Sequence, residues 1–213
     1  MADISALLWP KSVAIVGAAE DISILRGRIL NVMRMHGFAG SLHPVNRKLK
    51  KVQGLQAYPS IDAIPEPVDL AVLIIPAEAV ADEMIRCGEA GIKAVQILAS
   101  GFAEEPGERG VAMQSHIQEI AKQYDMAVAG PNSEGFTNLV AKLCVTFSTT
   151  MEMGDQPLIP DNTNGRIAVV AQSGGVGYSF FERGRLKELP FSYIISTGNE
   201  ACLETLQIVD HLL

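Results

Sequence analysis

The sequence predicts an α/β protein built around a parallel β-sheet. Short apolar runs alternate along the chain with longer segments of helical periodicity, which is the pattern of strands joined by helical crossovers. One run, LAVLII at residues 70–75, is apolar at every position, as expected for a parallel strand covered on both faces. With 213 residues, 48% hydrophobic and 19% charged, the chain is globular and long enough for one large domain or one domain plus part of another.

The first domain is expected to span residues 1–135. Its strands are predicted at 12–16, 41–45, 70–75, 94–98 and 126–129, and its helices at 23–35, 78–90 and 108–124. Gly37 and Gly91 end the first two helices, because glycine favours the left-handed conformation that closes a helix. Residues 58–64 are expected to form a loop or a short helix. This alternation implies right-handed crossovers between parallel strands.

Residues 136–164 are predicted to be a linker, because the alternation stops and MEMGDQPLIPDNTNG, residues 151–165, is rich in turn formers. A second α/β domain is expected over 165–213. Its strands are predicted at 167–170 and 193–196, and its helices at 176–189 and 203–213. Two strands cannot shield both faces of a parallel sheet. We therefore expect that the natural protein continues past residue 213 or that a partner covers this part.

Composition argues against several classes of function. The net charge of −7 argues against general affinity for nucleic acid or anionic membranes, and no apolar stretch approaches the ~20 residues of a membrane span. The three cysteines form no CxxC pair, so no disulfide framework or zinc site is expected, and a reducing cytoplasm is the simplest compartment. The N-terminus shows no signal peptide pattern. The four histidines are expected to be packing or surface residues, and no metal site is predicted.

The stretch VAIVGAAEDISILRG, residues 13–27, predicts a strand, a small-residue turn and a helix start, where backbone N–H groups can approach a phosphate. It is not a dinucleotide fingerprint, because Gly17 is followed by alanines and GxGxxG fails. After the second strand, where an acid would bind the ribose of NAD, the chain has Asn46. The next five positions hold four cations, Arg47, Lys48, Lys50 and Lys51. They could hold the 2′-phosphate of NADP or the phosphates of another ADP-containing ligand, or they form an ordinary solvated loop.

Further loops follow the other strand ends. SGFAEE, residues 100–105, permits close backbone approach, and GPN, residues 130–132, presents an amide beside the hydroxyl of Ser133. QSGG, residues 172–175, places N–H groups at a helix start, where an anion is stabilised, and GNE at 198–200 faces the same side. Each of these loops could also be a purely structural turn. A serine hydrolase is not expected, because Ala171 stands where GxSxG needs a glycine before Ser173.

Together these stretches resemble the NDP-forming acyl-CoA synthetases, a family related to the α subunit of succinyl-CoA synthetase. The segments PKSVAIVGA, GFAGSLHPVN, VDLAVLIIPAEAV, SGFAEEPGERG, GPNSEGF, GRIAVVAQSGGVG and STGNE occur in the order seen in the family and cover nearly the whole chain. The resemblance implies a Rossmann-like CoA-binding domain followed by the first part of a flavodoxin-like, succinyl-CoA-ligase-like domain.

The resemblance also implies an activity. In that family a carboxylic acid, CoA and a nucleoside triphosphate become acyl-CoA, NDP and phosphate, through an acyl phosphate and a phosphohistidine. The histidine is expected beyond residue 213. ATP or ADP and Mg are expected to bind an ATP-grasp domain on the same chain or on a partner subunit. A cytoplasmic acid–thiol ligase, incomplete on this chain alone and forming a homo- or hetero-oligomer, is therefore expected.

The resemblance assigns site residues by position. Those implied to bind CoA are Gly17, Ala18, Ala19, Gly27, Val45, Asn46, Lys48, Pro76, Ser100, Gly101, Phe102, Gly130 and Pro131, and those implied to serve catalysis are Asn132, Gln172, Ser173 and Gly174. Three positions depart from the family: Arg47 replaces a proline, Ala171 replaces a serine, and Cys202 stands where many members carry an acid. Two other readings stay open at this point. They are a non-catalytic CoA-binding regulatory module, as found fused to protein acetyltransferases, and an NADP-binding oxidoreductase domain.

Overall fold

The computed structural model describes residues 3–152 and 166–213. Its first sheet has five parallel strands in the order β2-β1-β5-β6-β7, and its second has four strands in the order β10-β11-β8-β9. The strands of the first sheet are β1 (Ser12–Val16), β2 (Ser41–Val45), β5 (Leu70–Leu73), β6 (Ala94–Ile97) and β7 (Ala127–Ala129). The first two have the predicted bounds, and the others are one or two residues shorter than predicted. The predicted parallel α/β fold is confirmed.

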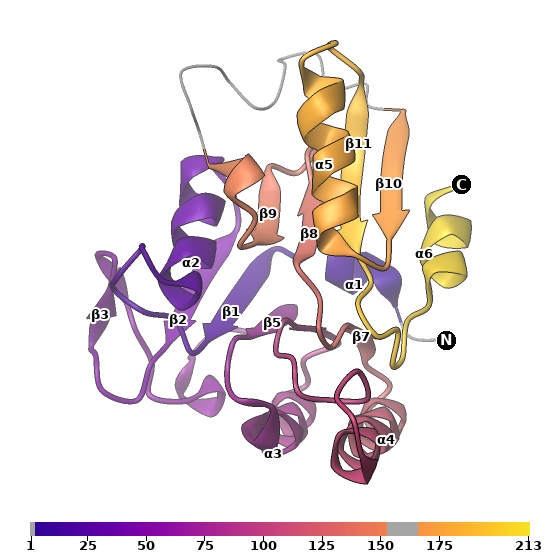
Figure 1. The fold of residues 1–213 in the computed structure, drawn as a ribbon. Coiled ribbons are helices and arrows are strands. Elements are labelled where there is room, and N and C mark those ends of the chain that lie inside the picture. The colour runs from indigo at the N-terminus through magenta and orange to yellow at the C-terminus, as the bar shows by residue number, and fades with distance from the viewer. Residues whose placement is uncertain (1–2, 153–165) are drawn as a thin grey trace.

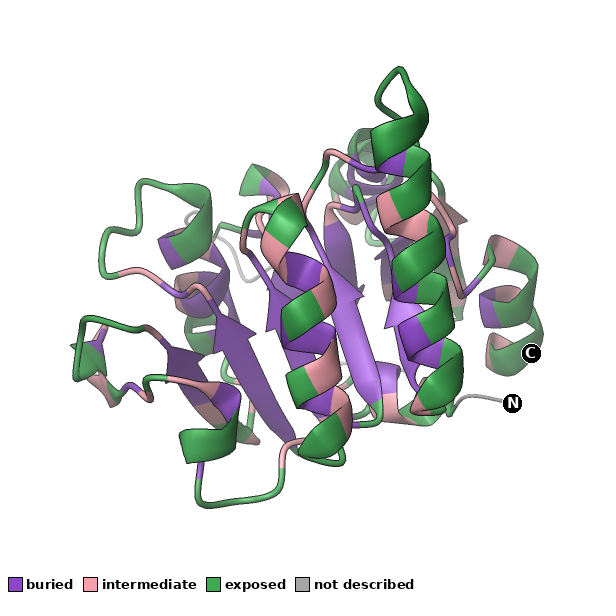
Figure 2. Ribbon diagram, turned by 90° about the horizontal axis from the view of Figure 1, so that it is seen from below, coloured by how far each residue is buried: buried purple, intermediate pink, exposed green. Residues whose placement is uncertain are grey.

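Helices cover both faces of the first sheet (Figure 1). On one face lie α3 (Ala77–Glu89) and α4 (Glu108–Gln123), and on the other lie α1 (Ile4–Leu8) and α2 (Leu25–Met35). Alternate residues of one strand supply the two cores, because successive side chains point to opposite faces. In β1, Ile15 packs in the cluster with α1 and α2, whereas Ala14 packs with α3 and α4. Figure 2 shows this burial, with the strands buried and the outer sides of the helices exposed.

The chain order reverses beside β1. From β1 it passes to β2 at one edge of the sheet and then returns to β5 on the other side of β1. Such a switch point opens a crevice at the carboxyl ends of the strands, where open α/β sheets bind ligands. A short hairpin, β3 (Lys51–Val52) with β4 (Leu55–Gln56), and the 3₁₀ helix η1 (Ile61–Ala63) lie on the path from β2 to β5.

The second sheet corrects one prediction. Residues 136–164 do not form a linker throughout, because β8 (Gly135–Asn138) and β9 (Leu143–Thr146) form a hairpin, followed by η2 (Thr149–Met151). β8 pairs antiparallel with β11 (Phe191–Ser196), which in turn pairs parallel with β10 (Ile167–Ala171). The second sheet therefore has four described strands rather than the two expected. The part of the predicted linker at 153–164 lies outside the described residues.

Two helices and the second sheet together form the second layer of the protein. The helices are α5 (Gly174–Arg185) and α6 (Thr205–Leu212), both shorter than predicted. The two layers share a core, in which Val32 of α2 packs with Cys144 of β9 and with Tyr178 and Phe181 of α5. Within residues 3–152 and 166–213, no helix has both the length and the apolar character needed to cross a membrane.

Candidate functional site

The loop after β1 lies directly against the exit of β5. Gly17 has a φ of 93°, a conformation that side chains rarely adopt, and a Cβ there would stand 2.5 Å from the carbonyl oxygen of Ile74. Gly27 serves a second close approach, because a Cβ there would overlap the carbonyl group of Asp21. The two glycines therefore let one loop run tightly between β5 and the first turn of α2.

The backbone N–H groups of this loop do not match the expectation that they approach a phosphate. Gly17 donates to the carbonyl of Val45 (3.1 Å), Ala18 to that of Ile15 (3.4 Å) and Ala19 to that of Arg26 (3.3 Å). These three donors are used within the chain, so they do not supply the expected phosphate contacts. The buried residues Ala18 and Val45 contribute packing and backbone to the crevice rather than exposed side chains.

Asn46 joins this loop to the next. Its Nδ2 donates to the carbonyl of Ala18 (2.8 Å), while its Oδ1 accepts from the N–H groups of Lys48 and Leu49, both at 2.9 Å. The asparagine thus fixes the loop that presents the cations. Gln53, which was not predicted, braces the same place: its Nε2 donates to the carbonyls of Ala19 (3.1 Å) and Gly27 (2.8 Å).

The four cations after β2 are exposed. Within the described residues, none of Arg47, Lys48, Lys50 and Lys51 has an acidic partner within ion-pair distance. Arg47 lies toward α3, where burial raises the pKa of Glu83 and the charges of Arg86 and Arg47 oppose that rise. The three lysines are therefore accessible to an anionic ligand in the loop that follows β2.

The loops after β5 and β6 also touch. Gly101 has a φ of 105°, and a Cβ there would lie 3.3 Å from Cβ of Ala77. Ala77 follows Pro76, which is exposed. Ser100 is exposed. Phe102 is fully buried in the core, so its side chain packs against the α3 and α4 side of the sheet. The sequence implied a ligand contact for Phe102, but the structure gives its side chain a structural place.

The GPN loop follows β7 and holds an exposed amide. Gly130 and Pro131 are joined by a cis peptide bond, and both residues are buried. Asn132 has a φ of 54°, is exposed, and donates its N–H to the carbonyl of Ala99 (2.8 Å). Ser133 is unlike its neighbour, because it is buried and its Oγ donates to the carbonyl of Ser196 (2.7 Å). Asn132 is therefore the polar side chain that this loop presents.

The loop after β11 is hydrogen-bonded both to the GPN loop and to the loop after β10. The N–H groups of Asn199 and Ala201 donate to the carbonyls of Pro131 (2.9 Å) and Gly130 (3.2 Å). The N–H of Gly198 donates to the carbonyl of Gln172 (3.1 Å). These bonds bring the carboxyl ends of strands from both sheets to one place.

The start of α5 carries an unexpected acid. Ser173 is the exposed N-cap residue of α5, and its side chain makes no capping hydrogen bond within the described part of the chain. Gly174 is buried against Glu134, whose side chain occupies the space that a Cβ at Gly174 would need. Burial raises the pKa of the Glu134 carboxyl, against a hydrogen bond from Ser148. The sequence placed an anion site at this helix start, and the structure places a carboxyl group beside it.

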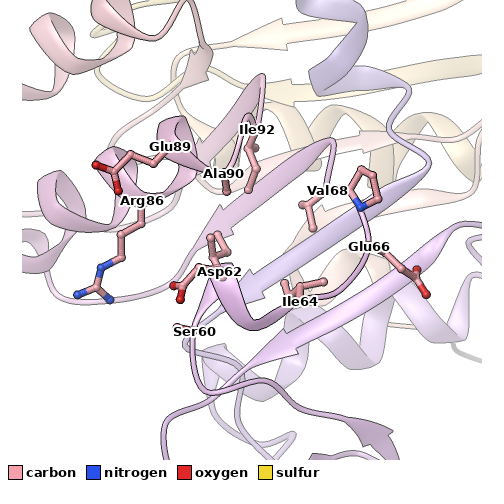
Figure 3. A pocket seen from close by; sticks show the side chains of 11 residues that line it. Ser60, Asp62, Ile64, Glu66, Val68, Arg86, Glu89, Ala90 and Ile92 are labelled. Carbon is pink, nitrogen blue, oxygen red and sulfur yellow. The ribbon is translucent and has the colours of Figure 1, made fainter.

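A cavity of about 720 Å³ lies at the amino ends of the strands of the first sheet, opposite the loops described above (Figure 3). It is bounded by η1, by the chain entering β5 and by the last turns of α3. Figure 3 shows Arg86 and Asp62 on one side of it and Glu66 turned away, so its charged groups do not converge. Within the described chain, no group of three or more His, Cys, Asp and Glu side chains is placed to hold a metal ion.

The structure therefore gathers the predicted residues in two groups along one edge. Gly17, Gly27, Asn46 and Lys48 surround the loops after β1 and β2, while Asn132 and Gln172 lie where the two sheets meet. This arrangement defines a Rossmann-like fold, a class that binds its ligands at the carboxyl edge of the sheet. The chain belongs to the CoA-binding domain family, whose model, described as CoA binding domain, matches residues 11–138. A second model, described as succinyl-CoA ligase like flavodoxin domain, matches residues 164–213.

Curated relatives agree with the predicted resemblance. The chain is 34% identical over 203 residues to the ADP-forming acetate–CoA ligase II subunit alpha of Pyrococcus furiosus, covering 95% of this chain and 42% of that protein. It is 34% identical over 214 residues to the ADP-forming acetate–CoA ligase II of Archaeoglobus fulgidus, covering 99% of this chain and 30% of that protein.

A solved structure shares the whole arrangement. The dinucleotide-forming acetyl-coenzyme A synthetase 1 of Ca. Korarchaeum cryptofilum, in complex with phosphate and ADP, superposes with a TM-score of 0.86 at 31% identity. The match covers 99% of this chain and 43% of that chain. The present chain thus spans less than half the length of these relatives. The predicted likeness to the NDP-forming acyl-CoA synthetases is confirmed.

Proposed function

We propose that this chain is the CoA-binding portion of an NDP-forming acyl-CoA synthetase. The observation that carries the proposal is the joining of strand-end loops from both sheets along one edge, with exposed lysines at one end and Asn132 at the other. CoA is a long ligand with three phosphate groups at one end and a thiol at the other. An edge with cations at one end and a polar amide at the other suits such a ligand.

The residues fit CoA better than a dinucleotide. Lys48, Lys50 and Lys51 would hold phosphates, while Gly17 and Gly27 keep the neighbouring loops close enough to leave the crevice open. Asn46 stands where NAD would need an acid. Asn132 would lie beside the thiol end, with Gln172, Ser173 and Gly174 forming the adjoining phosphate site of the complete enzyme.

The complete reaction is proposed by analogy with the relatives, which are named as ADP-forming ligases. A carboxylic acid, CoA and a nucleoside triphosphate would yield acyl-CoA, NDP and phosphate. The histidine, the ATP-grasp domain and its Mg would lie outside residues 1–213, on a cytoplasmic homo- or hetero-oligomer. The proposed division is a CoA-binding domain at 1–135 and part of the ligase domain at 165–213, with the hairpin of β8 and β9, from the segment between them, paired to the second sheet.

The alternatives predict different ligands or neighbours. An NADP-binding oxidoreductase domain would bind NADPH, and a regulatory module would bind CoA without a ligase around it. Both named relatives are ligases, which favours neither alternative. Isothermal titration calorimetry of the 213-residue chain with CoA and with NADPH separates the first alternative. Tight NADPH binding without CoA binding would contradict the proposal.

One substitution tests the phosphate end. Lys48→Glu is expected to weaken CoA binding by about 1–3 kcal/mol, because it replaces a charge-assisted contact by a repulsive one. Lys93→Glu makes the same charge change at an exposed position before β6, at the opposite edge, and is expected to leave the affinity unchanged. If both variants bind CoA like the native chain, Lys48 is not part of the site.

A further inference from the structure

Asn199, in the loop after β11, is hydrogen-bonded on every side. Its side-chain Nδ2 donates to Oε2 of Glu104 (2.5 Å) and to Oε1 of Gln114 (3.0 Å). Its Oδ1 accepts from Nδ2 of Asn132 (3.2 Å). A residue of the second layer thus stands between two loops of the first, and it touches the amide that the proposed CoA site presents.

The orientation of Asn199 is dictated by its neighbours. The carboxylate of Glu104 can only accept, and its Oε1 already accepts from the N–H groups of Gly101 (2.6 Å) and Phe102 (3.2 Å). Oε1 of Gln114 also accepts from the N–H of Ala103 (3.4 Å), so its oxygen faces the same way. Both neighbours therefore require the NH₂ group of Asn199, which leaves only its oxygen for the GPN loop.

The orientation of Asn132 follows from that of Asn199. Because Asn199 offers an oxygen, Asn132 must turn its Nδ2 toward it, which leaves its own Oδ1 as the acceptor for another group. The acid that begins this chain of constraints stays ionised. Burial alone would raise the pKa of Glu104, but hydrogen bonds from Asn199 and from backbone N–H groups outweigh it and lower that pKa.

We infer that Glu104 and Asn199 are positioning residues that fix which atom of Asn132 faces the thiol end of CoA. The inference rests on the proposed CoA site and adds to it the two residues that orient its amide. In this arrangement Oδ1 of Asn132 accepts a hydrogen bond from the thiol. The residues come from the loops after β6, β7 and β11, so the second layer sets the polarity of a site on the first.

Exchanging one atom reverses the constraint. In Glu104→Gln the new side chain keeps its oxygen on Gly101 and Phe102 and turns an NH₂ group toward Asn199. Asn199 then faces a donor and an acceptor at once, and it no longer fixes Asn132. Adding Asn199→Asp supplies a side chain that only accepts, from the NH₂ group introduced at position 104 and from Nδ2 of Asn132. The Gln114 amide then turns over, gives up its long bond from Ala103 (3.4 Å) and donates its own NH₂ group to the new carboxylate, and the native orientation of Asn132 is restored. Asn199→Asp alone instead sets two carboxylates against each other.

The test is calorimetric titration of the 213-residue chain with CoA and with desulfo-CoA, which lacks the sulfur atom. The native chain is expected to prefer CoA by about threefold to fivefold, the range of one modest hydrogen bond. Glu104→Gln reduces this preference to about onefold, and the double variant returns it to within about twofold of the native value. Affinity for desulfo-CoA stays unchanged throughout. Glu105→Gln, the same exchange at the neighbouring exposed acid, leaves the preference intact.

The outcomes separate the two proposals. If the native chain binds neither ligand, the proposed CoA site fails, and the inference falls with it. If the native chain binds both ligands equally, the CoA site stands but Asn132 does not contact the thiol, and the inference is overturned. If Glu104→Gln keeps the preference, or the double variant fails to regain it, Glu104 and Asn199 do not orient Asn132. A lost affinity for desulfo-CoA in the variants would mean that these residues only support the fold, which also overturns the inference.

Discussion

Gly198 joins the two layers so closely that the smallest side chain should separate them. A Cβ there would overlap the carbonyl oxygen of Pro131 and lie 2.8 Å from that of Asn132. The backbone at Gly198 also has a φ of 61°, in the left-handed region. Gly198→Ala therefore both strains the backbone and pushes the loop after β11 away from the GPN loop.

The size of the effect can be worked from these contacts. An alanine in the left-handed region costs roughly 1–2 kcal/mol. Pushing the loop away also loses the hydrogen bonds from Asn199 and Ala201 to the GPN loop, each contributing about 1 kcal/mol. The expected loss in the free energy of unfolding is thus about 3–4 kcal/mol. Gly37→Ala is the matched control, because Gly37 has a φ of 73° and no atom of the described residues lies within 4 Å of its added Cβ.

Urea unfolding followed by circular dichroism measures both variants against the native chain. Gly37→Ala is expected to lose only the backbone contribution, about 1–2 kcal/mol, so the two variants should differ by about 2 kcal/mol. A second reading comes from CoA titration, because Gly198→Ala should also weaken the thiol-end contact whereas Gly37→Ala should not. Equal losses of stability in the two variants would refute the close contact between the loops.

Three more predictions follow from single side chains. Asn46→Ala removes three hydrogen bonds that shape the loop with the four cations after β2, and it is expected to weaken CoA binding by about 1 kcal/mol. Asn31→Ala on α2 should leave the affinity for CoA unchanged. Equal affinities of the two variants would contradict a shaping role for Asn46. Phe102→Ala empties a fully buried position and should lower the free energy of unfolding by about 3–5 kcal/mol in urea; a loss below about 1 kcal/mol would place the ring outside the core. Burial raises the pKa of Glu83 above 4.5, so its contribution to stability is complete below pH 4.5 and is lost as the pH rises through the raised pKa. As the pH rises above 4.5, the melting temperature of Glu83→Gln should therefore fall less than that of the native chain. Parallel profiles of melting temperature against pH would show that burial does not perturb the acid.

The first sheet was predictable because each of its strands is a short apolar run with a turn at its end. Parallel strands leave at one edge, so the position of the site loops followed from the order of the elements. The hairpin of β8 and β9 was missed because buried polar residues disguise it. Asn138 donates to the carbonyl of Leu8 (2.9 Å) and Thr137 hydrogen-bonds Tyr178 (3.1 Å), so these residues are buried with partners although they read as loop formers.

The site was only partly predictable for a related reason. Cations after a strand and a glycine in a tight turn are local signals, and Gly17 and Lys48 carried them. Glu104 and Asn199 are 95 positions apart, and nothing in either local sequence shows that they meet. The same holds for Gln53, whose role depends on a hairpin folding back over the first loop. Pairings of this kind depend on tertiary structure rather than on residue type.

The contact between α2 and β9 bears on how the chain can be divided. Val32 faces Leu139, Cys144 and Met151, all of which come after residue 135. A fragment that ends at residue 135 would expose this apolar side of α2 to water and invite aggregation. The CoA-binding portion therefore cannot be cut from the chain at the end of its own sheet without exposing this apolar surface. A shorter protein built from that sheet alone would need polar substitutions on α2 or a replacement cover.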